Sequence, residues 1–248
     1  MAWRFNYSMD SIQGRRTNNE DAIAVHVEDD FLVAVVADGM GGQAAGEIAS
    51  GLAVRLILEK VNQFASGSEI DEKERVRKIL WEVNQEILHS GTQNMRQSSM
   101  GTTVVLLIRP KGADHFLVAH LGDSRAYECK DKNLTVLTSD HTLTQYMVRQ
   151  GIITPEQAIK HPYRNRLVKY LGAKDPQDGP DISLLPIKDG QKILLCSDGL
   201  LNGLSEKDIL QSISSLPTEG LTSKLCQAAF DGNSQDNISC VVLDVSQV

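Results

Sequence analysis

Four aspartates lie beside strongly apolar runs, and this arrangement is the one in the sequence best suited to chemistry. They are Asp38 after residues 31–37, Asp123 after residues 115–121, Asp198 after residues 192–197 and Asp236 before residues 238–245. Apolar runs of this length are typical of buried strands. A carboxylate at the end of such a strand is costly to remove from water unless a cation, a proton or N–H donors accompany it. The four aspartates therefore predict one shared acidic site.

Carboxylates that converge in the ionised form require divalent cations. At an effective dielectric constant near 20 they repel one another by on the order of several kcal/mol per pair. A ligand set made only of oxygen atoms selects the hard ions Mg²⁺ or Mn²⁺. The four cysteines are widely separated in the sequence and form no zinc-binding motif. Two hard ions a short distance apart activate a water molecule and hold a phosphoryl group for in-line displacement.

Other phosphate chemistries lack their sequence motifs. The chain has no G-x-x-x-x-G-K-[ST] loop of a nucleotide-hydrolysing enzyme and no G-x-S-x-G nucleophile motif. An aspartyl-phosphate enzyme would need a second acid at position 40, which is Met40. A cysteine phosphatase would need an arginine six residues after its cysteine, and none of the four cysteines has one. Metal-activated water is the chemistry that remains.

Length and composition favour a single domain. The chain has 248 residues, of which 41% are hydrophobic, so one domain spanning residues 1–248 can bury a large core. The net charge of −7 argues against a nucleic acid or an anionic membrane as a partner. No apolar run approaches the ~20 residues that cross a bilayer, and residues 1–10 lack the features of a signal peptide. We therefore expect a cytoplasmic, monomeric protein without a membrane or nucleic-acid partner.

The elements that must position the acids follow from the spacing of apolar residues. Alternation with period two predicts an early strand over residues 3–9, and a second short strand is expected over residues 22–27. A helical period predicts a long helix over residues 43–65 and a second over about residues 71–89. Later strands are expected at residues 102–108, 115–121, 125–129, 134–137, 192–197 and 237–245, and later helices from residue 205 and around residues 221–229. Short spacings with turn residues favour antiparallel hairpins over βαβ crossovers.

The segment of residues 141–174 differs from the rest of this acidic chain. It contains six lysines and arginines but a single acid, Glu156. Thr154, Pro155 and Gln157 form the pattern of a capped helix start. We expect two short helices in a basic insert. The insert could dock phosphopeptides, or it could be a solvated basic surface.

Seven motifs resemble, in order, those of the metal-dependent type 2C protein Ser/Thr phosphatases, in particular the bacterial branch. They are RTNNED at residues 16–21, VADGMGG at 36–42, SMGTT at 99–103, GDSRAY at 122–127, SDH at 139–141, SDG at 197–199 and DNI at 236–238. The resemblance covers nearly the whole chain. It implies an α+β fold, a four-layer αββα sandwich of two stacked antiparallel sheets flanked by helix pairs. The insert corresponds to the family's flap, at about residues 145–172.

The resemblance also implies a core of two metal ions, Mn²⁺ or Mg²⁺. Asp38 would bridge the two ions, and the carbonyl of Gly39 would bind one of them. Asp198 and Asp236 would bind the other. Each of these positions matches a position of the family's motifs in this sequence.

Further roles are implied around that core. Glu20 and Asp21 would hold metal-bound waters. Asp123 matches the acid that, with Asp198, forms a third and weaker metal site in bacterial members. Arg16 would hold the substrate phosphate as a two-pronged donor that a lysine could not replace.

The sequence lacks one histidine that many members of the family have near the Asp-Gly pair. Many relatives have a histidine just after the Asp-Gly pair, or a few residues later, as a candidate proton donor to the leaving group, whereas this chain has Met40 and Gln43 at these two places. We assign no histidine a catalytic role.

The predicted activity is hydrolysis of phosphoserine and phosphothreonine in proteins by a water that two metal ions activate, in opposition to a bacterial Ser/Thr kinase. Two alternatives remain. One is a silent phosphoprotein-binding module, which the complete set of acids argues against. The other is a phosphatase for small phosphoesters.

Overall fold

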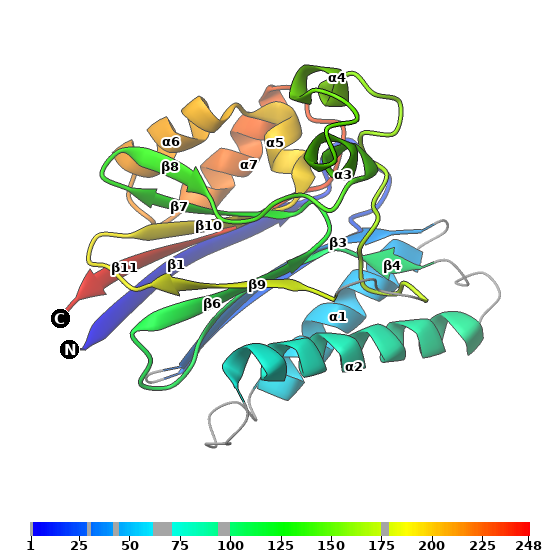
Figure 1. Ribbon diagram of the computed structural model, residues 1–248. Coiled ribbons are helices and arrows are strands. Elements are labelled where there is room, and N and C mark those ends of the chain that lie inside the picture. Colours follow the sequence, from blue (N-terminus) through cyan, green and yellow to red (C-terminus); the bar gives the residue numbers. More distant parts are fainter. Residues whose placement is uncertain (1, 29–30, 42–44, 62–70, 94–99, 175–178) are drawn as a thin grey trace.

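The computed structural model describes residues 2–28, 31–41, 45–61, 71–93, 100–174 and 179–248. Its centre is a pair of stacked antiparallel sheets with helices on both outer faces (Figure 1). Sheet A has the order β1 (Trp3–Ile12), β11 (Ile238–Gln247), β10 (Lys192–Cys196), β7 (Arg125–Lys130), β8 (Asn133–Val136). Sheet B has the order β2 (Asp21–Glu28), β3 (Phe31–Met40), β5 (Val104–Arg109), β6 (His115–Leu121), β9 (Asp181–Pro186), and β4 (Gly101–Thr102) pairs with the end of β3.

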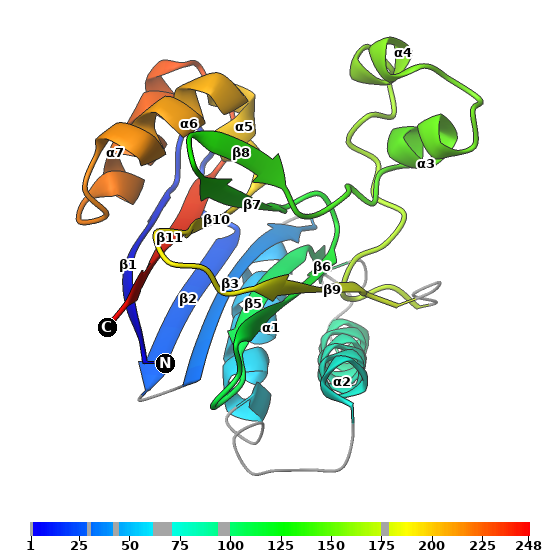
Figure 2. The same ribbon diagram turned by 60° about the vertical axis from the view of Figure 1, so that its left-hand side comes forward.

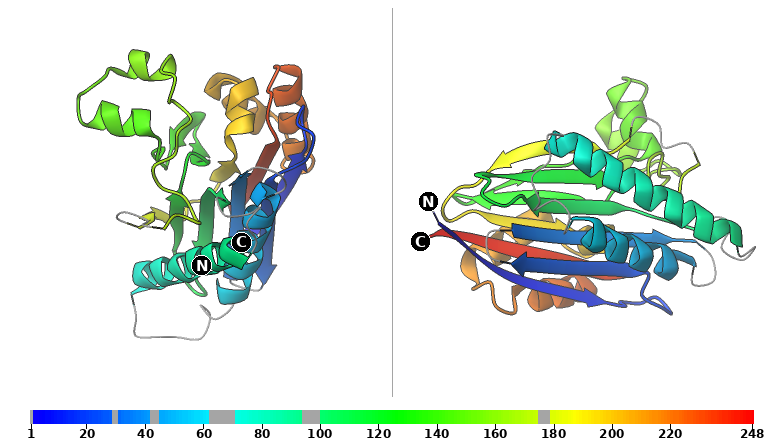
Figure 3. Two further views of the ribbon diagram at one scale, coloured as in Figure 1. Left: turned by 90° about the vertical axis from the view of Figure 1, so that its right-hand side faces the viewer. Right: turned by 90° about the horizontal axis from the view of Figure 1, so that it is seen from below.

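Helices cover the outer face of each sheet. On sheet B, α1 (Ala45–Val61) and α2 (Glu72–Gln93) lie side by side, as the view from below shows (Figure 3). On sheet A lie α5 (Asp198–Gly203), α6 (Glu206–Ser215) and α7 (Leu221–Asp231). The short helices α3 (Leu143–Arg149) and α4 (Pro155–Ile159) project away from the sandwich (Figure 2).

Strand β3 explains why the sheets stack. All residues from Phe31 to Ala37 are buried. Because side chains alternate along a strand, Val33 and Val35 pack with α1 and α2, whereas Leu32 and Val36 pack against sheet A. A third apolar layer lies between sheet A and its helices. Three apolar layers therefore separate four layers of secondary structure, and the predicted four-layer αββα sandwich with antiparallel sheets is confirmed.

Most predicted elements are present, with three differences. The first strand continues to Ile12, and the strand expected over residues 102–108 is interrupted at Thr103, where β4 ends and β5 begins. The sequence analysis did not predict β9 or α5. The ends of the first predicted helix, including Gln43, lie outside the described residues.

The insert contains the two short helices expected from its sequence. Thr142 caps α3 by accepting a hydrogen bond from the backbone N–H of Gln145. Thr154 and Gln157 form a reciprocal capping box at the start of α4. Among the described residues, no helix is long and apolar enough to cross a membrane.

Candidate active site

The predicted site residues other than Asp21 line one cavity of about 670 Å³. Asp38 comes from β3 of sheet B, Asp198 begins α5 after β10, and Asp236 precedes β11 of sheet A. The cavity is also lined by Arg16, Glu20, Gly39 and Asp123. Asp21 lies directly opposite Asp38 in the pairing of β2 with β3. On the insert side the wall is formed by Asn165, Arg166 and Tyr170.

Asp38 lies inside β3 rather than at its end, because β4 extends the pairing to Met40. Its backbone is held by two threonines. The N–H of Asp38 donates to Thr103 Oγ1 at 2.9 Å, and its carbonyl accepts from Thr103 N at 2.8 Å and from Thr102 Oγ1 at 2.9 Å. With its main chain fixed in this way, Asp38 presents its carboxylate from a rigid support.

Gly39 permits a close approach that any side chain would block. A Cβ atom at this position would lie 2.1 Å from the carbonyl oxygen of Gly46 in α1 and 2.6 Å from that of Glu20. The N–H of Gly39 donates to the carbonyl of Glu20 at 3.0 Å. The first turn of α1 and the segment before β2 are therefore packed directly against the strand that supplies Asp38.

Asn237 fastens the loop that contains Arg16 and Glu20. Its Nδ2 donates to the carbonyls of Gln13 and Asn18, both at 2.8 Å, and its Oδ1 accepts from the N–H of Glu20 at 2.9 Å. The residue is only 5% exposed. The sequence analysis gave Asn237 no role. The available signal was an amide directly after Asp236, at the start of a buried strand.

Ser197 is a second residue whose role the sequence did not reveal. Its hydroxyl donates to Asp21 Oδ2 at 2.8 Å and accepts from the N–H of Ser239 at 3.1 Å. Asp21 belongs to sheet B, whereas Ser197 and Ser239 belong to the end of β10 and to β11 of sheet A. Ser197 therefore ties the two sheets together beside the acids.

Burial shifts the protonation of the clustered acids. Loss of solvent raises the pKa of Asp38 well above its usual range, and the charges of Asp21 and Asp198 raise it further. The same loss raises the pKa of Asp21 and of Asp123 to about 7 each. Burial together with the charge of Asp236 raises the pKa of Asp198 to about 6.

The acids suit a divalent cation by their chemistry. Asp198 Oδ1 is buried and has no hydrogen-bond partner among the described residues. A buried polar atom without a partner is costly, and a cation would satisfy it. With the other carboxylates that line the cavity, this atom offers only oxygen ligands, the type that Mn²⁺ and Mg²⁺ prefer.

The adjacent arginines of the loop have different contacts. Arg16 Nη2 donates to Asp236 Oδ2 at 2.8 Å, and its Nε donates to the carbonyl of Gln235 at 3.1 Å. Arg15 instead lies over the ring of Phe230, 4.6 Å from its centroid. Arg16 lines the cavity and its Nη1 takes no part in these two hydrogen bonds, whereas Arg15 belongs to the surface beside α7.

Of the two residues that replace the family's histidine, the structure describes Met40. Met40 lines the cavity, and none of its described lining residues is a histidine. Gln43 lies outside the described residues.

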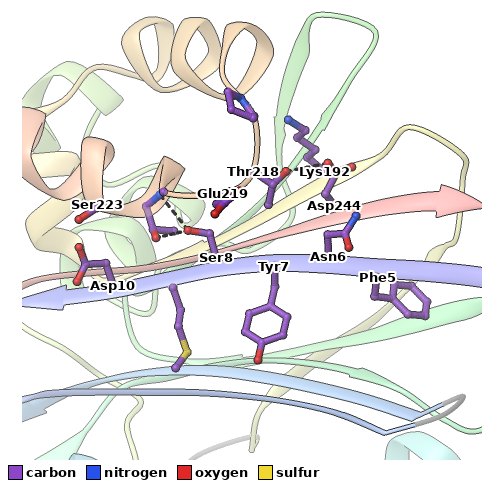
Figure 4. A pocket seen from close by; sticks show the side chains of 14 residues that line it. Phe5, Asn6, Tyr7, Ser8, Asp10, Lys192, Thr218, Glu219, Ser223 and Asp244 are labelled. Atoms are coloured by element: carbon purple, nitrogen blue, oxygen red, sulfur yellow. Dashed lines mark hydrogen bonds between the residues drawn. The ribbon is translucent and has the colours of Figure 1, made fainter.

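A larger cleft, of about 1000 Å³, lies elsewhere, between β1 and the start of α7 (Figure 4). Several of its polar groups already have hydrogen-bond partners. The hydroxyls of Ser8 and Thr222 lie 2.5 Å apart, Thr218 Oγ1 donates to Asp244 Oδ2 at 2.7 Å, and Lys192 Nζ donates to main-chain carbonyls at the end of α6. Three acids line this cleft, but Asp10 and Asp244 lie at its opposite ends (Figure 4) and none of the three belongs to a predicted site motif, so the smaller cavity is the candidate active site.

Comparisons with known proteins identify the class. Residues 10–229 match the family model described as protein phosphatase 2C. This match covers most of the chain, and the chain belongs to the protein phosphatase 2C family. The family and the enzyme class predicted from the sequence, a phosphoprotein phosphatase, are confirmed.

The similar proteins are bacterial Ser/Thr phosphatases. The chain is 35% identical over 234 residues to the Ser/Thr phosphatase stp of Listeria welshimeri. The aligned region covers 92% of this chain and 91% of that protein. It is 32% identical over 241 residues to protein phosphatase PhpP of Streptococcus pneumoniae, with 94% of both chains covered. The crystal structure of the Mycobacterium tuberculosis Ser/Thr phosphatase PstP superimposes with a TM-score of 0.85 at 31% identity, over 98% of this chain and 99% of that chain.

The raised pKa values predict how stability depends on pH without divalent cations. The folded protein then retains protons on Asp21, Asp123 and Asp198 at pH values where the unfolded chain, with carboxyl pKa values near 3.8, has released them. The free energy of unfolding should therefore fall as the pH rises from about 4 to about 7. Urea denaturation in EDTA across this range measures the effect.

Matched variants identify the groups responsible. Asp123→Asn should make the fall shallower, whereas Glu219→Gln, at an exposed side chain, should leave it unchanged. A free energy of unfolding that stays flat or rises from pH 4 to pH 7 contradicts this account.

Replacing Asn237 should loosen the loop that contains Arg16. Asn237→Ala removes three partly buried hydrogen bonds, which should cost roughly 2–4 kcal/mol in the free energy of unfolding. Asn133→Ala is the control, because the side chain of this exposed first residue of β8 makes one long hydrogen bond, at 3.3 Å to the carbonyl of Asp131. Equal stability of the two variants in urea denaturation would refute the fastening role.

Proposed function

We propose that this protein hydrolyses phosphoserine and phosphothreonine in proteins, using two divalent metal ions held at the shared acidic site. The observation that supports this most directly is the convergence of Asp38, Asp198 and Asp236 from both sheets on one cavity, together with the unpartnered Oδ1 of Asp198. The catalytic domain of PstP in complex with two manganese ions superimposes with a TM-score of 0.84 at 29% identity. We assign Mn²⁺ or Mg²⁺ to this chain by that likeness.

The residues that would hold the two core ions are those that the family motifs mark. Asp38 would bridge them, the carbonyl of Gly39 would bind one, and Asp198 and Asp236 would bind the other. When bound, the ions would activate a water molecule and neutralise charge on the transferring phosphoryl group.

The acids around the core would have supporting roles. Asp21 and Glu20 would accept hydrogen bonds from metal-bound waters. Ser197 and Asn237, which are bonded to Asp21 and to the N–H of Glu20, would hold both residues in place. Asp123 would complete a weaker third site with Asp198.

Arg16 would orient the substrate. Its guanidinium is fixed in the cavity wall by Gln235 and Asp236, with Nη1 available for a phosphate oxygen. A planar guanidinium can donate two parallel hydrogen bonds to a phosphate, which a lysine cannot.

The partners of this activity are phosphorylated proteins. We propose that a Ser/Thr kinase supplies them, so that kinase and phosphatase form a signalling pair. We also propose that residues 1–248 act as one monomeric catalytic domain in the cytoplasm. The insert at residues 145–172 would face the substrate, because Asn165 and Arg166 line the cavity.

Turnover of a phosphopeptide and of a sugar phosphate, each with Mn²⁺, tests the assignment. Preference for the phosphopeptide supports a protein phosphatase. Preference for the sugar phosphate would favour a phosphatase of small phosphoesters, and phosphopeptide binding without turnover would indicate a silent binding module.

Loss of the bridging carboxylate should abolish hydrolysis. Asp38→Asn should lower kcat with Mn²⁺ by roughly 100-fold or more, because no neighbouring acid can replace a ligand shared by two ions. Asp114→Asn, an exposed acid on the loop before β6, should keep wild-type activity. Phosphopeptide kinetics and calorimetric Mn²⁺ titration measure the two effects, and full activity of Asp38→Asn would overturn the metal assignment.

Loss of Arg16 should act mainly on substrate binding. Arg16→Ala should raise KM for a phosphopeptide by roughly tenfold or more and leave Mn²⁺ affinity nearly unchanged. Arg16→Lys should recover only part of the loss. Arg15→Ala is the matched control, because Arg15 lies on Phe230 and does not line the cavity. Identical KM values for the Arg16 and Arg15 variants would mean that Arg16 is a surface residue.

A further inference from the structure

The peptide group before Asp123 is held by a histidine to which the proposed mechanism gives no role. The backbone N–H of Gly122 donates to His141 Nδ1 at 3.2 Å, and the carbonyl of Gly122 accepts from the backbone N–H of His141 at 2.9 Å. Gly122 has a φ of +110°, a conformation that residues with a side chain rarely adopt. His141 is only 3% exposed. Both polar groups of Gly122 are therefore bonded to one buried residue.

The other side of Gly122 is closed by Thr103. A Cβ atom on Gly122 would lie 2.6 Å from both Cβ and Cγ2 of Thr103. Thr103 is the residue that also holds the backbone of Asp38, and its hydroxyl lies 2.7 Å from that of Ser124. Gly122 is thus fixed between His141 and the support of Asp38, and this fixes the starting point of the Asp123 side chain.

The hydrogen bond to Gly122 determines the tautomer of His141. A ring nitrogen that accepts from an N–H group has no proton of its own, so the proton of the neutral ring resides on Nε2. Nε2 makes no hydrogen bond among the described residues, although Asp181 Oδ2 lies 3.3 Å from it. Burial lowers the pKa of His141 to about 4, which keeps the ring neutral near pH 7.

The groups around His141 do not form a cation site, although ligand atoms of His120, His141 and Asp181 lie within 4.8 Å of one another. The two imidazole rings are stacked, with centroids 4.4 Å apart and an interplanar angle of 4°. Lone pairs of nearly parallel rings lie in separate planes and cannot meet at one ion. In addition, His141 Nε2 is protonated in the tautomer that Gly122 requires. The stack therefore supports the orientation of the His141 ring.

The backbone of the same residue lies at the base of the insert. The carbonyl of His141 accepts from the N–H of Val168 at 2.8 Å, and the next residue, Thr142, forms a β-bridge with Leu167. The two ends of the insert are thus joined at His141 and Thr142. Arg166, which lines the cavity, directly precedes this bridge.

We infer that His141 is a positioning residue for the third metal site: its Nδ1 holds the N–H of Gly122, and its main chain holds both the carbonyl of the Gly122–Asp123 peptide and the base of the insert. This inference rests on the proposed function, in which Asp123 and Asp198 hold a weak third ion. His141 acts through the backbone and does not touch the substrate. Its neutral ring provides the acceptor that a left-handed peptide at Gly122 requires.

Two variants separate the ring's functions. In His141→Asn the side-chain oxygen can occupy the position of Nδ1 and still accept from Gly122. In His141→Gln the amide lies near the position of Nε2, and the N–H of Gly122 loses its partner. We expect His141→Gln to weaken the third Mn²⁺ site by roughly 10–100-fold and His141→Asn to weaken it far less, with the two tight sites unchanged in both.

Calorimetric Mn²⁺ titration measures these affinities directly, without reference to turnover, and phosphopeptide kinetics should show a lowered kcat for His141→Gln with KM nearly unchanged. His161→Gln is the matched control. In the insert, His161 Nδ1 also accepts a hydrogen bond from a backbone N–H, that of Tyr163 at 3.2 Å. Its ring is not the one that binds Gly122. This control should leave all Mn²⁺ sites at wild-type affinity.

A measurement on the unaltered protein makes the test independent of variants that fail to fold. Two-bond proton–nitrogen correlation spectra of the imidazoles should show His141 as the neutral tautomer with its proton on Nε2 near pH 7. A proton on Nδ1 would overturn the inference, as would equal Mn²⁺ affinities of the third site in His141→Gln and wild type. Absence of any Mn²⁺ binding by the wild-type protein would instead contradict the proposed function.

Discussion

The constraint on which this structure depends is the cost of holding several carboxylates together away from water. Asp21, Asp38, Asp123 and Asp198 all have raised pKa values because they are buried beside one another. Such a cluster opposes folding unless protons or cations neutralise it. The three apolar layers of the sandwich provide the stability that offsets this local cost. The acids are thus kept in place by the fold rather than by their own interactions.

The acids can come together only if the two sheets are stacked in one relative position. Sheet B contributes Asp38 and Asp21, whereas Asp198 and Asp236 come from the ends of strands in sheet A. Hydrogen bonds from small polar residues help to fix that relative position. Ser197 reaches from the end of β10 to Asp21, and the amide of Asn237 binds three backbone groups of the loop before β2. These contacts determine the geometry, and the carboxylates occupy the positions that result.

The sequence predicts the acids and their strands because buried strands leave long apolar runs that end abruptly. It does not predict β9, which has no regular alternation of buried and exposed residues, or α5, whose six residues include two glycines. Gly203 of α5 is explained only by packing, since a Cβ atom there would lie 2.1 Å from the carbonyl of Ala229 in α7. Contacts such as that of Asn237 with Gln13 join residues 224 positions apart, and no local pattern records them. Residue roles at the site came from the order of the motifs rather than from periodicity.

Arg16 and Asp236 show how the phosphate-binding and metal-binding parts of such a site are joined. Their ion pair at 2.8 Å is more than half exposed on the arginine side, so it contributes at most about 1 kcal/mol to stability. Its effect is on orientation: together with the carbonyl of Gln235, it fixes the plane of the guanidinium. Because Asp236 is also a proposed metal ligand, the same carboxylate faces both the cation and the group that would hold the phosphate. A change at Asp236 therefore disturbs both parts, whereas a change at Arg16 removes one donor to Asp236 and leaves every carboxylate of the cluster present.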